Sequence, residues 1–396
     1  MGLTDILNEM MQSEIDKGLA KESFLLIYKD NEKIFENGFT DFKDRPAPND
    51  KTIFKMFSMT KPVTSLAAMI CLERGLFKYD DEVGKYIPEY SDMKVLCGEG
   101  TVPAKRKMLV SDLLNMTGGM EYPNDFSEAG KKLLFGLFRE VEEGYPEKTV
   151  PTLELMSKSA GFPLADQPGE TWNYSLCADV LGAVIEVASG MKYSEFLKEN
   201  IFKPLDMTDT DFYVPADKTD RFITMFDRKP DGSYEPWDYP FLGTFDRRHK
   251  PQFESGGAGL VSTPCDYANF ALLLANKGML PGKFSKDGDD IRLISEETWN
   301  FMTSPKLSED QLKRPHEFWY SMKGYNYGCL MRILEDKEAG GLPYSGLGEF
   351  GWDGWGGTYF CVDPVTGVVF LYFINQTNGN REEWMKKLKN TMYEYL

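Results

Sequence analysis

The sequence predicts an α+β fold in which both ends of the chain contribute to one antiparallel sheet. Strand-like patterns occur near the start and return near the end, and helical periodicity dominates between them. The strand patterns cover residues 23–30, 32–40, 325–334, 358–363 and 365–375. We therefore expect a sheet domain from residues 1–80 and 255–396, flanked by terminal helices, and an inserted mainly helical domain from residues 81–254.

The first eighty residues alternate between helix and strand signals. Residues 3–19 have the apolar spacing of an amphipathic helix, and the two strand patterns that follow are separated by a polar turn at Asn31. An apolar run, IFKMF, then leads into a helix from about residue 58 to 74, which Gly75 closes. These elements give the sheet two strands and at least two covering helices.

The middle of the chain carries five helical patterns punctuated by proline and glycine. They cover residues 111–116, 129–143, 152–159, 177–189 and 193–202. Residues 221–237 read as strand and turn. Near the end, the turn at 364–367 predicts a hairpin between the last two strands, and residues 380–395 have the pattern of a final helix.

Charge and composition narrow the possible partners. The 396 residues hold 45 Lys and Arg against 62 Asp and Glu, a net charge of −17 that disfavours nucleic acids and anionic membranes. The six cysteines lack the spacing of a zinc or disulfide framework, so no metal is implied. No apolar targeting segment is visible, and the longest apolar run, 368–374, is too short to span a bilayer. We expect a cytoplasmic monomer or homodimer.

Several common catalytic motifs are absent or lie in the wrong structural context. The glycines of the single G-x-G-x-x-G, Gly346, Gly348 and Gly351, precede a strand pattern where a dinucleotide fold needs a helix. The G-x-S-x-G motif of α/β-hydrolases is absent. The only two histidines, His249 and His316, lie among polar residues, which disfavours a Ser–His–Asp triad.

The pattern S-x-x-K occurs three times, at Ser58–Lys61, Ser91–Lys94 and Ser189–Lys192. Only Ser58 opens a helix after an apolar run, so Ser58 and Lys61 share a helix face. A helix N-terminus also stabilises negative charge on a nucleophile or its oxyanion. Taken alone, the pair also fits an N-cap serine and a solvated lysine.

The segment around Ser58 and four further segments, in this order along the chain, resemble the serine β-lactamase and penicillin-binding-protein superfamily. Within that superfamily they resemble the class C β-lactamase-like branch. The nucleophile motif is FSMTK (57–61), followed by LLNMTGG (113–119), PGETWNYSLCADVLGAVIE (168–186), ESGGAGLVSTPCDYANF (254–270) and GWDGWGGTYFCVDP (351–364). The resemblance covers most of residues 20–375. It implies a β-lactamase/transpeptidase-like fold with the active site between the two domains.

The resemblance also implies catalytic roles. Ser58 matches the acylated nucleophile, Lys61 the lysine that activates it, and Tyr174 the tyrosine of the second motif. The backbone N–H groups of Ser58 and Thr358 match the oxyanion hole. A serine hydroxyl needs an adjacent base, and either Lys61 or Tyr174 fits that role. A neighbouring Lys61 ammonium would lower the pKa of Tyr174, and burial would lower that of Lys61.

Two departures from the family's motifs favour one branch of it. The second motif ends in Leu176 where β-lactamases have Asn, and the third has Trp355 in place of Lys, Arg or His. This combination resembles the family VIII carboxylesterases and related acyltransferases. It implies a serine hydrolase of short acyl esters, with weak or no β-lactamase activity and no cofactor. The alternatives are a D-amino-acid peptidase, amidase or β-lactamase of the same superfamily, and a non-catalytic ligand-binding protein.

A small set of residues is expected to bind the substrate, an ester or amide of low molecular weight. The predicted contacts are Trp355, Gly356, Gly357, Tyr122 and Trp352, with Phe57 and Phe126 as looser candidates for the pocket walls. The glycine pair would let the substrate lie close to the backbone. Asp179, on the helix after Tyr174, is expected to bond nearby backbone.

Overall fold

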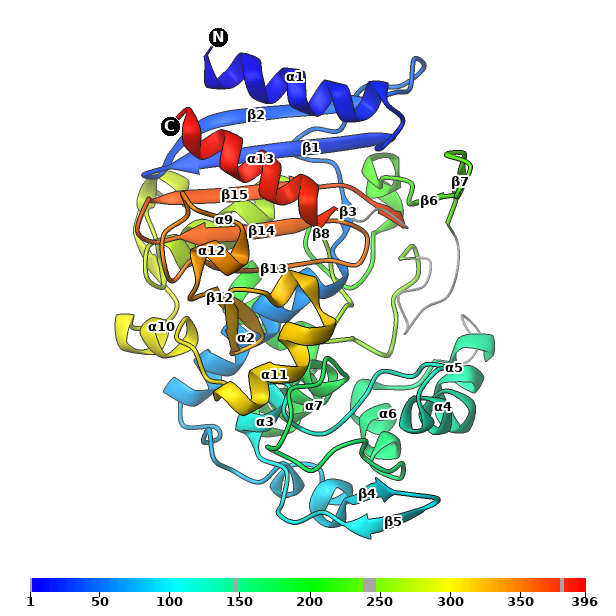
Figure 1. The fold of residues 1–396 in the computed structure, drawn as a ribbon. Coiled ribbons are helices and arrows are strands. Elements are labelled where there is room, and N and C mark those ends of the chain that lie inside the picture. Colours follow the sequence, from blue (N-terminus) through cyan, green and yellow to red (C-terminus); the bar gives the residue numbers. More distant parts are fainter. Residues whose placement is uncertain (1, 145–148, 238–246, 378–380) are drawn as a thin grey trace.

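The computed structural model describes residues 2–144, 149–237, 247–377 and 381–396. Its main feature is a seven-stranded antiparallel sheet of order β11-β12-β13-β14-β15-β1-β2 (Figure 1). The strands are β1 (Glu22–Lys29), β2 (Glu32–Thr40), β11 (Tyr325–Gly328), β12 (Met331–Leu334), β13 (Phe350–Asp353), β14 (Tyr359–Asp363) and β15 (Val368–Phe373). Strand β1 pairs with β15, with Leu26 opposite Leu371, so the two ends of the chain share one sheet. The predicted α+β fold class is confirmed.

Helices from the two termini cover one face of this sheet. Helices α1 (Leu3–Asp16) and α13 (Glu382–Glu394) lie side by side across it (Figure 1). Leu7 and Leu388 pack there against outward-facing side chains of the strands, such as Phe370. Both terminal helices were predicted, and α1 ends three residues before the expected boundary.

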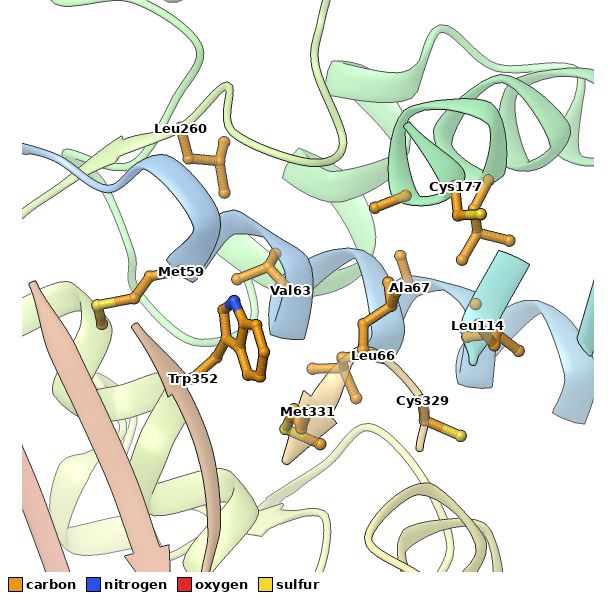
Figure 2. Packing of buried hydrophobic residues seen from close by; sticks show 14 of the residues in the cluster. Met59, Val63, Leu66, Ala67, Leu114, Cys177, Leu260, Cys329, Met331 and Trp352 are labelled. Atoms are coloured by element: carbon orange, nitrogen blue, oxygen red, sulfur yellow. The ribbon is translucent and has the colours of Figure 1, made fainter. Parts of the chain in front are cut away.

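The opposite face is covered by α2 (Thr60–Glu73) and α9 (Pro264–Ala275). Helix α2 is buried along almost its whole length, as its long apolar run requires. Figure 2 shows Val63 and Leu66 of α2 between sheet side chains such as Trp352 and side chains of the helical part such as Leu114. The helix that begins beside Ser58 therefore joins the sheet to the helical part.

The helices of the middle segment pack on the far side of α2. They are α3 (Val110–Leu114), α4 (Glu128–Leu133), α5 (Arg139–Gly144), α6 (Thr152–Ser159), α7 (Cys177–Ser189) and α8 (Tyr193–Leu197). The expected helix at 129–143 consists of α4 and α5 joined by a π-helical turn at Leu134–Phe138. A hairpin of β4 (Lys94–Cys97) and β5 (Gly100–Pro103) was not predicted.

Short elements complete the fold. They are β3 (Phe54–Lys55), β6 (Phe226–Arg228), β7 (Tyr234–Pro236), β8 (Val261–Ser262), β9 (Met279–Leu280), β10 (Ile291–Arg292), β16 (Gln376–Thr377), α10 (Glu296–Met302), α11 (Glu309–Phe318) and α12 (Lys337–Gly340). The pair β6–β7 is the strand-and-turn expected at 221–237. The final helix pattern at 380–395 agrees with α13, although residue 380 lies outside the described residues.

One strand prediction was wrong. Residues 325–334 form two antiparallel strands, β11 and β12, where a single strand was expected. The turn residues Cys329 and Leu330 have φ angles of 46° and 63°, as a two-residue type I′ hairpin requires. Both turn residues are buried and apolar, so the polar turn signal that marks Asn31 is missing here.

The division of the chain into domains at residues 80 and 255 stays a prediction. Within the ranges that the structure describes, no helix combines the length and apolar character needed to cross a membrane.

Candidate active site

Ser58 lies in a 3-10 turn, Phe57–Met59, that connects β3 to α2. Phe57 has a φ of +47°, a left-handed conformation that non-glycine residues adopt at some cost and that is common at functional turns. Helix α2 itself starts at Thr60, its N-cap is Met59, and no side chain caps it. Ser58 is therefore presented by a strained turn, and the reading of Ser58 as an N-cap is wrong.

Lys61 lies in the first turn of α2 and is fully buried. Its Nζ is 3.1 Å from Ser58 Oγ, 2.9 Å from Tyr122 Oη and 2.8 Å from the carbonyl oxygen of Gly257. The alternative that Lys61 is a solvated surface charge is therefore wrong. The amine instead has three polar partners and no contact with bulk water.

Burial lowers the pKa of Lys61 to about 7, and the negative charge of Asp179 opposes this shift. Asp179, on α7, is itself buried, and burial raises its pKa. Its Oδ1 accepts a hydrogen bond from the backbone N–H of Gly257, 3.1 Å away. Asp179 thus holds the loop in which the Gly257 carbonyl accepts a hydrogen bond from Lys61. This agrees with the backbone-bonding role predicted for Asp179.

Tyr174 lies beside the lysine and the serine. Lys61 Nζ is 4.4 Å from the centroid of its ring, and its Oη is 3.1 Å from Trp352 Nε1. Burial raises the pKa of Tyr174 above its ordinary value, and hydrogen bonds with Ser58 and Trp352 only partly offset this. The pKa of Tyr174 is therefore raised, where a lowering by Lys61 was expected, and burial is the main cause.

The third motif forms the loop between β13 and β14. Gly354 N–H donates to Thr358 O at 2.7 Å, Gly357 N–H donates to Gly354 O at 2.8 Å, and Thr358 Oγ1 donates to Met56 O at 3.3 Å. A Cβ built on Gly354 would lie 2.4 Å from Met56 O. The loop therefore touches the segment that leads to Ser58. The role of the Ser58 and Thr358 amides as an oxyanion hole stays a prediction.

The two glycines of this loop are needed by its own packing. A Cβ at Gly356 would lie 2.9 Å from the Phe57 ring. Gly357 has a φ of +93°, and a Cβ there would lie 2.7 Å from Ile374 Cγ2. These packing contacts alone account for glycine at both positions. The close approach of a substrate to Gly356 and Gly357 stays a prediction.

Replacing Gly357 with alanine is expected to destabilise the loop and lower kcat/KM. The strained φ costs about 1–3 kcal/mol, and the clash with Ile374 adds to it. Gly348→Ala is a matched control, because Gly348 has a φ of +84° but open space around its Cβ. Chemical denaturation should give a larger loss of unfolding free energy for Gly357→Ala. Equal losses would mean that the contact with Ile374 is unimportant.

Aromatic side chains flank the site on two sides. Trp355 is 51% exposed, and its ring centroid is 5.5 Å from that of Phe57 and 5.1 Å from that of Trp237. On the other side, the Trp319 ring lies 4.9 Å from the Tyr174 ring. Trp237 and Trp319 were not predicted, because neither belongs to a recognisable motif and both reach the site only through the tertiary fold.

Three predicted pocket residues need correction. Trp352 is only 2% exposed and Phe57 is equally buried, so neither offers a surface to substrate. Trp352 bonds Tyr174, and Phe57 lies under Trp355. Phe126 is 83% exposed, so it is not packed as a pocket wall. Tyr122 does lie in the site, but its hydroxyl bonds Lys61.

The two histidines lie apart from this cluster of contacts. His249 is exposed, and His316 Nε2 is 2.8 Å from the carbonyl oxygen of Tyr325 at the β11 edge of the sheet. Among the described residues, no three His, Cys, Asp or Glu side chains are grouped as metal ligands.

Comparison with known proteins places this chain in a family. The Beta-lactamase family model matches residues 7–388. Protein Rv1367c of Mycobacterium tuberculosis is 29% identical over 378 residues, covering 91% of this chain and 86% of that protein. Esterase EstB of Burkholderia gladioli is 27% identical over 338 residues, covering 84% and 79% respectively.

A solved structure has the same fold over nearly the whole chain. It is that of EstCE1, described as a hydrolase with promiscuous acyltransferase activity, with a TM-score of 0.80 and 21% sequence identity. The match covers 99% of this chain and 98% of that one. The fold expected from the five motifs is confirmed, and the chain belongs to the Beta-lactamase family.

Proposed function

We propose that this protein is a serine hydrolase that cleaves short acyl esters through a covalent acyl-enzyme on Ser58. The observation that carries the proposal is a buried Lys61 amine, with a pKa of about 7, placed 3.1 Å from the Ser58 hydroxyl. A base works best when its pKa lies near the working pH. An amine this close to a serine can take its proton at neutral pH.

The hydrogen-bond partners of Lys61 support its role as the base. A neutral amine has two N–H donors and one lone pair. The carbonyl of Gly257 can only accept, and the hydroxyl of Tyr122 can accept as well. If the amine donates to these two groups, its lone pair is left for the Ser58 hydroxyl.

The proposed reaction balances without a cofactor. The Ser58 proton passes to Lys61 as Oγ bonds to the acyl carbon, and the bond to the leaving alkoxide breaks as Lys61 gives this proton to the alkoxide. Water then attacks the acyl-serine, which releases the carboxylic acid and restores the Ser58 hydroxyl. Tyr174, with its raised pKa, keeps its proton and can donate a hydrogen bond to oxygen atoms at this centre.

The preference for esters rests on the third motif and on the relatives. Trp355 supplies an exposed indole where a cation would attract a substrate carboxylate, so neutral apolar esters fit better than β-lactam or peptide carboxylates. EstB and EstCE1 are named as an esterase and a hydrolase. The acyltransferase activity in the description of EstCE1 also favours a second candidate, transfer of the acyl group to an alcohol.

The test compares three substrate types on the purified protein. We expect p-nitrophenyl acetate and butyrate to be hydrolysed, and nitrocefin and a D-alanyl-D-alanine peptide to be turned over at least about 100-fold more slowly in kcat/KM. Mass spectrometry of quenched samples should show the acyl group on Ser58. Faster turnover of the lactam or peptide would select the peptidase, amidase or β-lactamase alternatives, and no turnover or labelling would favour a binding protein.

The rate of ester hydrolysis should rise with pH through about 7. Because burial lowers the pKa of Lys61, the neutral and basic form grows as the pH rises past about 7 and is nearly complete above about pH 8. At pH 6 the rate should be about one-tenth of the plateau. A rate that keeps rising above pH 9 would instead indicate a Tyr174 phenolate as the base, because the pKa of Tyr174 is raised.

A further inference from the structure

Trp352 contacts the site from the strand that precedes the third-motif loop. It lies on β13, three residues before Trp355, and its indole faces α2 beside Val63 (Figure 2). Its Nε1 is 3.1 Å from Tyr174 Oη. An indole N–H can donate but cannot accept a hydrogen bond, so Tyr174 must be the acceptor in this contact.

This one-way bond fixes how the Tyr174 hydroxyl can be used. A tyrosine oxygen that accepts from Trp352 still has its own hydrogen to donate, and Lys61 Nζ lies 4.4 Å from the centroid of the same tyrosine ring. Ser58 belongs to the same cluster, because its Oγ is 3.1 Å from Lys61 Nζ. Trp352 therefore holds the tyrosine hydroxyl in one orientation beside the Ser58–Lys61 pair.

We propose that Trp352 is a positioning residue for the acylation step: its indole N–H fixes the orientation of the Tyr174 hydroxyl beside Lys61, the partner of Ser58. The inference rests on the proposed function, because it assumes that Ser58 is the nucleophile and Lys61 the base. It also assigns a function to the strand before the third motif. The loop itself carries no cation, and the hydrogen bond to Tyr174 comes from β13.

The packing around Trp352 holds the indole in this orientation. Its ring meets the Tyr327 ring edge to face with centroids 5.2 Å apart, and the Arg332 guanidinium carbon lies 5.4 Å from its centroid. Arg332 in turn pairs with Asp353, the next residue on β13, at 2.5 Å. A side chain that is buried and bounded in this way can direct a hydrogen bond without reorganising during the reaction.

A double-mutant cycle tests the proposal. Trp352→Phe and Tyr174→Phe are made singly and together, and kcat and KM are measured for p-nitrophenyl butyrate across pH. We expect Trp352→Phe to lower kcat about tenfold with little change in KM, the scale of one lost hydrogen bond. In the Tyr174→Phe background the same change should cost less than about twofold. Equal losses in both backgrounds would overturn the proposal.

The chain offers a matched packing control in Trp172. Its ring is also buried against Tyr174, with centroids 6.0 Å apart, but its Nε1 has no hydrogen-bond partner among the described residues. Trp172→Phe removes a similar volume without removing a hydrogen bond, so kcat should stay within about twofold of wild type. A loss equal to that of Trp352→Phe would mean that packing alone explains the effect.

If Trp352→Phe does not fold, a shape-preserving replacement keeps the test decisive. Benzothienylalanine placed at position 352 by amber suppression retains the fused ring but has sulfur in place of the N–H. The same tenfold loss is expected, and wild-type kcat would overturn the proposal. Failure of the proposed function is distinguishable, because it would leave the wild-type protein itself without ester turnover or acylation of Ser58.

Discussion

Replacing Ser58 with alanine is expected to lower kcat for p-nitrophenyl butyrate by about 10⁴-fold or more, since the loss of a nucleophile removes the whole covalent route. What remains is the smaller effect of binding and of charge stabilisation at the site. The structural cost should be small, because Ser58 caps no helix and its Oγ contacts only the site itself. The measurement is steady-state kinetics, with thermal unfolding to show that the variant is folded.

A second serine on the same helix gives a matched control. Ser65 is fully buried on α2, and its Oγ has no hydrogen-bond partner among the described residues. Ser65→Ala should therefore keep both its fold and its ester hydrolysis. Diethyl p-nitrophenyl phosphate should add one phosphoryl group to wild type and to Ser65→Ala, and none to Ser58→Ala. Undiminished turnover by Ser58→Ala would show that another group is the nucleophile.

The fold could be predicted where periodicity and turn chemistry agree. Asp30 and Asn31 both have positive φ angles, and this polar turn marks the β1–β2 hairpin in the sequence. The β11–β12 hairpin uses the same turn geometry at buried Cys329 and Leu330. There, tertiary burial overrides the local preference for polar turn residues, so a single strand was the natural but wrong prediction.

The candidate site was predictable in its chemistry but not in its contacts. The spacing of Ser58 and Lys61 along one helix predicts their proximity, and the structure places them 3.1 Å apart. The pKa of Lys61 depends on burial by segments almost two hundred residues away, including the carbonyl of Gly257. No local sequence pattern predicts burial of this kind.

The exposure of the aromatic residues in the third-motif segment also depends on the tertiary fold. Trp352 and Trp355 lie three residues apart in one motif, yet the first is buried and the second half-exposed. Trp352 lies on β13 and faces the core, whereas Trp355 lies in the loop beyond the strand end. The strand boundary at Asp353 separates a residue that bonds Tyr174 from one that can meet a substrate, and sequence patterns fix such boundaries poorly.

Replacing Lys61 with methionine is expected to lower kcat by about 10³-fold, within the usual range for loss of a general base. Methionine nearly fills the same volume but cannot take the Ser58 proton. Its thioether also leaves the Gly257 carbonyl and the Tyr122 hydroxyl without their amine partner. Some loss of stability is therefore expected, and the kinetics should be measured well below the unfolding temperature of the variant.

Lys61→Arg separates the two ways in which Lys61 could act. A guanidinium keeps the positive charge but stays protonated, so it cannot serve as a base. If Lys61 is the base, Lys61→Arg should be as inactive as Lys61→Met, and propylamine should partly restore Lys61→Ala in proportion to its neutral form. If Lys61 instead works by its charge, lowering the pKa of Tyr174, Lys61→Arg should keep a tenth or more of wild-type kcat. The fully buried amine with a pKa of about 7 favours the first outcome, because a group so easily neutralised is a poor permanent cation and a good proton acceptor.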